Sequence, residues 1–226
     1  MGPPPRDLTR RGSPRTAARE RRDAAGERRS GRPSAGARSR RWKAARRLEA
    51  DVVYGLFPLN SGAGPTMNDT KALFHADHAN LTSAGTFDAT LLGAGRTLLR
   101  KQTAVGGRYL SLVPKYLLVP PERETAAEII LANASRRMTT EKTTAEWIAS
   151  LELVVEPRLA STAAYLATDP NQIDTVELGL LEENINGPYM ETEQGFDTDE
   201  TRWKIRHSAA AKALDFRGMV KLPISG

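Results

Sequence analysis

Apolar side chains recur at helical spacing in two segments of this chain. Between residues 41 and 57 they follow intervals of three and four, which predicts a helix over Arg41–Phe57 that ends before Pro58. A similar stripe predicts a second helix over Thr86–Gln102, with Arg100 and Lys101 beside its negative C-terminal end. The first stripe consists of Trp42, Ala45, Leu48, Val52 and Leu56, and the second of Phe87, Leu91, Ala94 and Leu98.

The middle of the chain has the pattern of an α/β core. Lys115–Val119 is a short apolar run, typical of a buried strand. It leads into two prolines and acidic residues, which favour the start of a helix that continues to about Ala134. Two further apolar runs, Leu151–Val155 and Ala163–Ala167, are expected to be strands.

The last third of the chain is dominated by β patterns. Asp174–Glu183, Gly187–Glu193 and Thr201–Pro223 alternate in a way that predicts consecutive strands, with turns at residues 186–187 and 194–195. We expect the final two stretches, Arg202–Ser208 and Ala213–Lys221, to be the arms of one hairpin or extended ribbon. The chain as a whole is therefore predicted to be α+β.

Charge divides the chain near residue 47. Residues 1–47 contain 15 Arg and one Lys against four acids, a net charge of +12, whereas the remaining residues have a net charge of −6. Residues 1–41 hold almost no large apolar side chain, so they cannot bury enough surface to offset the entropy of ordering. We expect a disordered tail over residues 1–41 and a folded body over residues 42–226. Such a tail could neutralise nucleic-acid phosphates, although it lacks the interleaved aromatic residues that stack on bases.

Candidate chemistry in the folded body is sparse. The chain has no Cys, three His and no glycine-rich phosphate loop. His75 and His78 could converge on one metal ion, with Asp77 orienting one of them, but the third ligand would have to be the distant His207 or another carboxylate. A hydrogen-bonded loop is the commoner reason for such a cluster. Acids at the start of the helix after Pro121 suit the helix dipole, and Ser111 lacks the flanking glycines of a nucleophile elbow. We therefore predict no catalytic residue, no metal site and no cofactor.

Acidic and basic residues crowd the C-terminal strands. Calcium binding is one interpretation of the acids, but their spacing matches no EF-hand loop. Contacts between subunits are another, because complementary charges fix the register of an interface. The candidate contact residues are Arg46, Arg47, Glu191, Glu193, Asp197, Arg202, Arg206 and Arg217. No run of about 20 apolar residues is present, so no membrane span is expected.

Five motifs in order resemble the major capsid subunits of tailed phages. They are Arg46–Val53, Leu73–Leu81, Pro114–Pro121, Leu153–Leu159, and Gly187–Tyr189 followed by Gly195–Asp197. Within that family the chain is most similar to the Mu-like major head subunits, often described as fusions of a prohead protease to a capsid protein. The resemblance covers about residues 42–223.

The resemblance implies the Hong Kong 97 phage capsid fold, in which a spine helix and a β-rich peripheral domain flank an α/β axial domain. Residues 42–57 would be the end of the spine helix, residues 86–167 mainly the axial domain, and residues 174–223 mainly the peripheral part. Since the tail resembles neither the arm nor the loop that precede the spine helix in the family, we expect a truncated subunit.

The resulting expectation is a structural protein rather than an enzyme. It would self-assemble into the hexamers and pentamers of a phage or prophage head around DNA bound without sequence preference, first in the bacterial cytoplasm and finally in the virion capsid. It would use no membrane and no small-molecule substrate. Two alternatives stay open, namely the maturation protease end of a protease–capsid fusion and a small nucleic-acid-binding protein with a basic tail.

Overall fold

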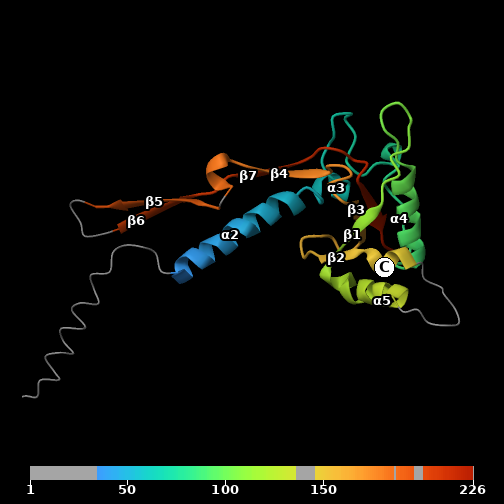
Figure 1. Ribbon diagram of the computed structural model, residues 1–226, viewed down its shortest axis with the longest axis horizontal. Helices are drawn as coiled ribbons and strands as arrows, with labels where there is room; N and C mark the ends of the chain where they lie inside the picture. The colour runs from blue at the N-terminus through green and yellow to red at the C-terminus, as the bar shows by residue number, and fades with distance from the viewer. Residues whose placement is uncertain (1–34, 136–145, 186, 196–200, 226) are drawn as a thin grey trace, which may run out of the picture.

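The structure, a computed structural model, consists of an α/β core and a long arm (Figure 1). It describes residues 35–135, 146–185, 187–195 and 201–225. Of the tail predicted for residues 1–41, residues 1–34 lie outside the described residues. The arm contains one long helix and two antiparallel ribbons, and it extends to one side of the core (Figure 1).

The core is built on a four-stranded sheet with the order β2-β1-β3-β8. Its strands are β1 (Pro114–Val119), β2 (Glu152–Val155), β3 (Ala163–Thr168) and β8 (Met219–Pro223). Strands β1 and β2 are parallel, and the other two pairs are antiparallel. Every residue of β3 is buried, as expected for a central strand covered on both faces.

Helices α4 (Ala89–Lys101) and α5 (Glu124–Ser135) bury their apolar residues in one hydrophobic cluster on the first face of the sheet. Asp88 caps α4 by accepting a hydrogen bond from the Leu91 amide at 2.9 Å, and two basic residues end the helix as predicted. A short 3-10 helix, η2 (Pro121–Arg123), leads into α5, and another, η3 (Glu146–Ser150), packs against it. Both predicted core helices are thus confirmed within three residues at most boundaries.

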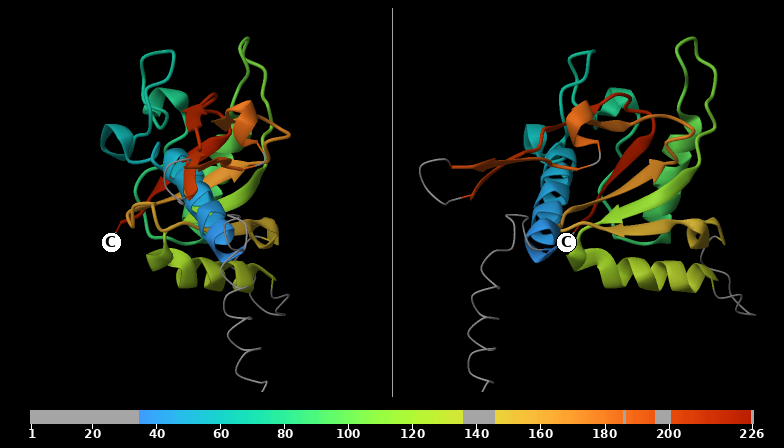
Figure 2. Two further views of the ribbon diagram at one scale, coloured as in Figure 1. Left: turned by 90° about the vertical axis from the view of Figure 1, so that its left-hand side faces the viewer. Right: turned by 60° about the vertical axis from the view of Figure 1, so that its left-hand side comes forward.

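The second face of the sheet is covered by the chain that joins the arm to the core. A second hydrophobic cluster packs Phe57, Leu73 and Phe74 against Tyr165 of β3 and Met219 of β8. The segment includes the turn α3 (Leu59–Gly62) and the 3-10 helix η1 (Ala76–His78). Two loops, around residues 64–72 and 103–113, project from the core away from α5 (Figure 2).

The arm begins with helix α2 (Ala35–Tyr54). The predicted helix started at Arg41 and ended at Phe57, so the prediction was wrong at both ends. Residues 35–41 include two Ala and three Arg, which are strong helix formers and allow the helix to begin before its apolar stripe does. At the other end Gly55 donates to the Asp51 carbonyl, and a Cβ at Gly55 would lie only 2.6 Å from that oxygen, so the tight turn requires glycine.

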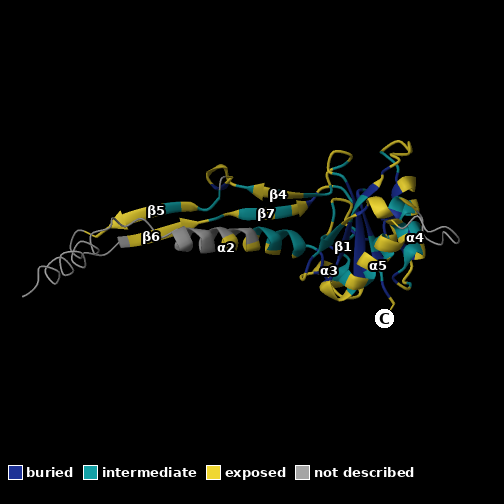
Figure 3. Ribbon diagram, turned by 60° about the horizontal axis from the view of Figure 1, so that its bottom comes forward, coloured by how far each residue is buried: buried dark blue, intermediate teal, exposed yellow. Residues whose placement is uncertain are grey.

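Two ribbons follow α2 along the arm (Figure 3). Strand β4 (Val176–Leu180) pairs with β7 (Ala209–Ala213) next to α2, and β5 (Tyr189–Gln194) pairs with β6 (Thr201–Arg206) further from the core. The 3-10 helix η4 (Glu182–Asn184) lies between β4 and β5. The ribbons are mostly exposed or intermediate in burial, whereas the core strands are mostly buried (Figure 3).

The predicted hairpin of Arg202–Ser208 with Ala213–Lys221 was wrong. Strand β6 pairs with β5, β7 pairs with β4, and β8 leaves the arm to pair with β3 in the core sheet. Residues 219–223 therefore lie in the core rather than in the β-rich arm to which residues 174–223 were mainly assigned. The physical reason is burial, since Met219, Val220 and Leu222 are 6%, 0% and 0% exposed in the core sheet.

Two glycines of α4 should respond oppositely to replacement by alanine. A Cβ at Gly93 would meet no atom within 4 Å, whereas a Cβ at Gly95 would lie 2.7 Å from Leu222 Cδ2 and 2.9 Å from Leu166 Cδ1. Gly93→Ala is expected to raise the free energy of unfolding by about 0.5–1 kcal/mol through helix propensity. Gly95→Ala should lower it by about 1 kcal/mol, because overpacking outweighs that gain. Urea unfolding of the two variants checks this, and equal shifts would contradict the packing at Gly95.

Candidate functional site

The outer ribbon, β5–β6, carries a ladder of opposite charges on one face. Glu191 is the cross-strand partner of Lys204, and Glu193 is the cross-strand partner of Arg202. The Lys204 Nζ lies 3.8 Å from Glu191 Oε2. Since directly opposite residues share a face of the ribbon, acids of β5 meet bases of β6 within one subunit.

Arg206 is also engaged within the arm. Its guanidinium lies 4.9 Å from the centre of the Tyr189 ring and 4.0 Å from Glu183 Oε2. The Arg206 and Glu183 side chains are partly exposed, so both also remain accessible to a neighbouring subunit. The opposite face of the ribbon alternates to apolar residues, among them Trp203 and Ile205, which are 43% and 39% exposed.

The other predicted contact residues are placed differently. Arg217 donates to the Thr103 carbonyl at 2.8 Å and forms an ion pair with Asp215 at 2.8 Å, so both of these bonds are made within its own chain. Arg47 is on the exposed side of α2. Arg46 belongs to α2 by its backbone, but its side chain and the whole of Asp197 lie outside the described residues. The subunit-contact role of all eight residues stays a prediction.

Helix α2 is tied to the core by the Arg158 guanidinium. Arg158 donates from Nε to Asp51 Oδ1 at 2.5 Å and from Nη1 to Glu156 Oε1 at 2.7 Å. The Glu156 side chain is only 11% exposed, so the ion pair with Arg158 offsets the cost of burying its carboxylate. Hydrogen bonds to Glu156 and Asp51 raise the pKa of Arg158. This contact sets where the arm leaves the core.

A second contact ties α2 to the ribbons. His207, in the bend between β6 and β7, places Nε2 3.0 Å from Glu49 Oε1. Nearby, buried Asn184 donates to the Arg206 carbonyl at 3.1 Å and accepts from the Ser208 amide at 3.0 Å. These bonds satisfy backbone groups where the two ribbons meet, so the bend is held in a defined geometry.

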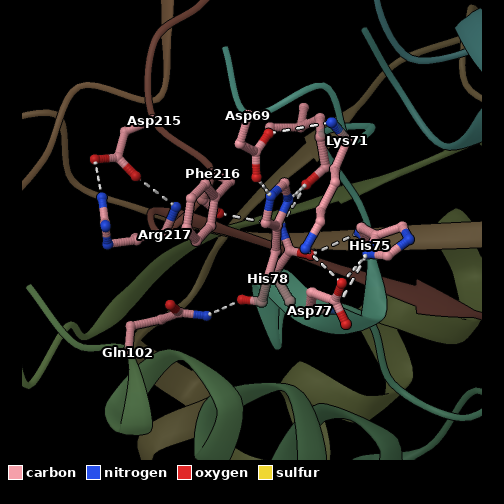
Figure 4. Close-up of polar contacts among 11 residues, drawn as sticks. Asp69, Lys71, His75, Asp77, His78, Gln102, Asp215, Phe216 and Arg217 are labelled. Carbon is pink, nitrogen blue, oxygen red and sulfur yellow. Dashed lines mark hydrogen bonds and ion pairs between the residues drawn. The ribbon is translucent and has the colours of Figure 1, made fainter. Parts of the chain in front are cut away.

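The His75–His78 cluster is a hydrogen-bonded loop (Figure 4). The buried His78 ring lies with Nδ1 3.0 Å from the Leu73 carbonyl and Nε2 2.7 Å from Asp69 Oδ2, and it stacks on Phe216 at 3.9 Å. Lys71 pairs with Asp77. Among the residues that the structure describes, no group of three or more His, Cys, Asp or Glu is arranged to hold a metal ion.

Buried amides complete this loop. Asn80 is fully buried and donates to the carbonyls of Leu73 and Phe216 at 2.7 and 3.1 Å, while it accepts from the His75 amide at 3.1 Å. Gln102 at the end of α4 donates to the His78 carbonyl at 2.9 Å (Figure 4). No local pattern in the sequence points to either residue, since nothing local distinguishes a buried amide from an exposed one.

The Asp69 contact predicts a pH dependence of stability. The hydrogen bond from His78 is the main reason why the pKa of Asp69 lies below its ordinary value of 3.8. The folded chain therefore binds this proton less tightly than the unfolded chain, so the contact stabilises the fold above pH 3.8 and is lost as pH falls through the lowered pKa. Asp69→Asn is expected to flatten the fall in urea midpoint as the pH is lowered below 3.8. Asp174→Asn is the control, because the Asp174 carboxylate makes no hydrogen bond or ion pair within the described ranges; identical profiles for the two variants would contradict the prediction.

Comparison with known proteins supplies the decisive observation. The family described as phage capsid protein matches residues 43–222, which include both the core and the arm. The chain belongs to the phage capsid protein family. Membership points to a structural, non-enzymatic protein of a phage shell, with the virion capsid as its location. Across the described residues, α-helices of the length and apolarity needed to span a bilayer are absent.

No curated protein matches this phage capsid protein in sequence. Among solved structures, it is similar to a chain of "Satellite phage P4 procapsid including size determination (Sid) protein", with 10% identity and a TM-score of 0.42. That similarity covers 100% of this chain and 76% of the other.

Proposed function

We propose that this chain is a subunit of a phage head shell that assembles with copies of itself around DNA, with the Hong Kong 97 capsid fold of the Mu-like head subunits. The observation that carries the proposal is the arm, in which α2 lies along two antiparallel ribbons that extend from an α/β core (Figure 1). An elongated subunit of this kind presents long edges to its neighbours. A closed shell repeats one set of such edge contacts under symmetry.

In this proposal α2 is the spine helix, the core is the axial domain and the two ribbons are the peripheral domain. The division differs from a simple split along the sequence, because β8 returns to the core sheet after the ribbons. The loop around residues 103–113 adds exposed apolar surface, with Val105 93% and Tyr109 72% exposed. Such residues at the tip of a projecting loop are suited to contact with another copy.

Assembly of the full chain tests the proposal. Size-exclusion chromatography and negative-stain imaging should show rings or shells that form above a threshold concentration. Shells recovered after nuclease treatment should retain DNA without a preferred sequence. A chain that stays monomeric at every accessible concentration would contradict the proposal.

A charge exchange tests whether the β5–β6 ladder contacts a neighbouring subunit. The double variant Glu191→Lys with Lys204→Glu keeps the ion pair inside the ribbon but reverses the charge presented at both positions. We expect normal thermal unfolding with an assembly threshold raised about tenfold, because like charges across an interface are unfavourable. Unchanged assembly would show that these positions face solvent in the shell.

The basic N-terminal segment favours a second candidate function, nucleic-acid binding. Residues 1–47 carry a net charge of +12, which favours salt-dependent nucleic-acid binding. Removal of residues 1–34 should weaken DNA binding by the free subunit while leaving assembly intact. If DNA binding accounts for all activity and no assembly is seen, the basic-tailed nucleic-acid-binding protein is the better description.

A further inference from the structure

A pocket of about 360 Å³ opens between the turn after α2 and strands β3 and β8. It lies on the second face of the core sheet, beside the point where the arm joins the core. The pocket is lined by Phe57, Ser61, Gly62, Arg158, Tyr165 and Lys221, among others. None of the sequence motifs pointed to it, because its walls come from three separate parts of the chain.

Lys221 brings a positive charge into this pocket. It is half-buried, and its Nζ donates to the Gly62 carbonyl at 2.6 Å. Within the described ranges no carboxylate lies in ion-pair distance of this ammonium. Burial alone accordingly lowers the pKa of Lys221 below its ordinary value. A partly buried charge without an opposite charge is costly, and an anion that entered the pocket would offset that cost.

Tyr165 adds a second donor at the same place. It is the cross-strand partner of Lys221, so both side chains leave the same face of the sheet. The Tyr165 ring packs edge-on against Phe57 at 4.8 Å, and the residue is only 2% exposed. In the part of the chain that the structure describes, its hydroxyl has no hydrogen-bond partner. Burial raises the pKa of Tyr165 to about 12, so the hydroxyl keeps its proton and remains a donor.

The turn that forms the rim of the pocket is conformationally strained. Asn60 and Ser61 have φ of 50° and 57°, and Gly62 has φ of 84°. Left-handed backbone at two non-glycine residues is unfavourable and persists only where surrounding contacts hold it. Asn60 supplies one such contact by donating to the Gly64 carbonyl at 2.8 Å. The strained turn is what presents the Gly62 carbonyl to Lys221.

The remaining cation of the pocket is already neutralised, since Arg158 pairs with Asp51 and Glu156. The pocket therefore offers one uncompensated positive charge and one neutral hydroxyl donor. That combination matches a carboxylate, which has one charge and two acceptor oxygens. Binding of a nucleic-acid backbone, by contrast, uses several Lys and Arg side chains along a strand.

We propose that this pocket receives an Asp or Glu side chain of a second copy of the chain, held by the Lys221 ammonium and the Tyr165 hydroxyl. The inference rests on the proposed function as a shell subunit. Residues 48–226 contain 23 acids and 17 bases, so the body of a neighbouring copy has carboxylates in excess. The pocket is then one half of a contact that repeats through the shell.

Zero-length cross-linking of the assembled full chain tests the proposal. A carbodiimide joins lysine amines to carboxylates in contact with them, and a mixture of light and isotope-labelled chains distinguishes links between copies from links within one. We expect mixed-isotope peptides that join Lys221 to an Asp or Glu of another copy. Lys115 is the internal control, because its Nζ lies 2.6 Å from Asp169 of its own chain and should give only unmixed links.

Three variants complete the test. Lys221→Met should raise the assembly threshold about tenfold and Tyr165→Phe about threefold, as expected for a charged and a neutral hydrogen bond. Tyr165→Phe should leave thermal unfolding of the free subunit unchanged or slightly improved, since the lost hydroxyl makes no hydrogen bond to the residues that the structure describes. Lys221→Arg should retain most assembly. Wild-type thresholds for both Lys221→Met and Tyr165→Phe, or assembled chains with no Lys221 cross-link, would overturn the proposal.

The source of the anion is tested on the free subunit. Acylation of Lys221 by an amine-reactive reagent is followed by mass spectrometry with sodium acetate, inorganic phosphate or duplex DNA present. Protection by acetate and by assembly supports the carboxylate of a second copy. Protection by phosphate or DNA alone overturns it. If the chain never assembles, the proposed function fails, and protection by acetate would then show an oxyanion pocket whose occupant is not another copy.

Discussion

Replacement of Asn80 by Leu is expected to lower the free energy of unfolding by about 4 kcal/mol. The side chain is fully buried and bonds three backbone groups, the carbonyls of Leu73 and Phe216 and the amide of His75. Leucine has a similar size but leaves all three groups without a partner. Each buried backbone group that loses its partner costs about 1–3 kcal/mol. Urea unfolding followed by tryptophan fluorescence measures the change.

The control for this substitution is Asn68→Leu. Asn68 is exposed and makes no hydrogen bond within the described residues, so its replacement should change the free energy of unfolding by less than about 0.5 kcal/mol. A loss at Asn80 no larger than that at Asn68 would mean that the loop from Leu73 to Asn80 is not held to the core by this amide. Because Phe216 lies near the return of the chain into β8, loss of Asn80 should also loosen that return.

The substitution Arg158→Met is expected to lower the free energy of unfolding by about 3 kcal/mol. Methionine keeps an aliphatic stem but removes the charge that neutralises Glu156 and bonds Asp51 of α2. Glu156 is then left as a nearly buried carboxylate without its partner. Asp51 lies on α2, whereas Glu156 lies in the core. The same substitution should therefore also weaken the attachment of the arm to the core.

A double-mutant cycle separates these two contributions. In the Arg158→Met background, Glu156→Gln removes the uncompensated charge and should recover about half of the lost stability. Asp51→Asn in the same background should recover little, because Asp51 is well exposed to solvent. If Glu156→Gln recovers nothing, the contribution of Arg158 comes from packing rather than from charge. Assembly of the rescued variant, measured separately, reports on the position of the arm.

Much of the local structure could be predicted because it depends on local patterns. The apolar stripe in residues 87–98 and the capping position of Asp88 define α4, and the prolines after Val119 define the start of the next helix. The apolar runs at β1, β2 and β3 were found within one residue at most ends. Short-range spacing is enough for such elements, because neighbouring side chains decide which faces are apolar.

The candidate site was less predictable. Glu191 and Arg206 were recognised as charged positions in β patterns, but their partners within the ribbon depend on the β5–β6 register. Arg217 is held within its own chain by bonds to Thr103 and Asp215, and no local pattern indicates the bond to Thr103. The pocket around Lys221 was missed for the same reason, since Gly62 and Tyr165 are distant from it in sequence.

The amino-acid sequence by itself determined the helices, the individual strands, the division of charge between a basic segment and an acidic body, and the resemblance to phage capsid subunits. Only the tertiary structure decided that β6 pairs with β5 and that β8 leaves the arm for the core sheet. It also decided which polar residues are buried and that Lys221 contacts the Gly62 carbonyl. The physical reason is that an alternating strand can pair with many partners of the same pattern. The choice among them depends on how much apolar surface the whole chain can bury at once.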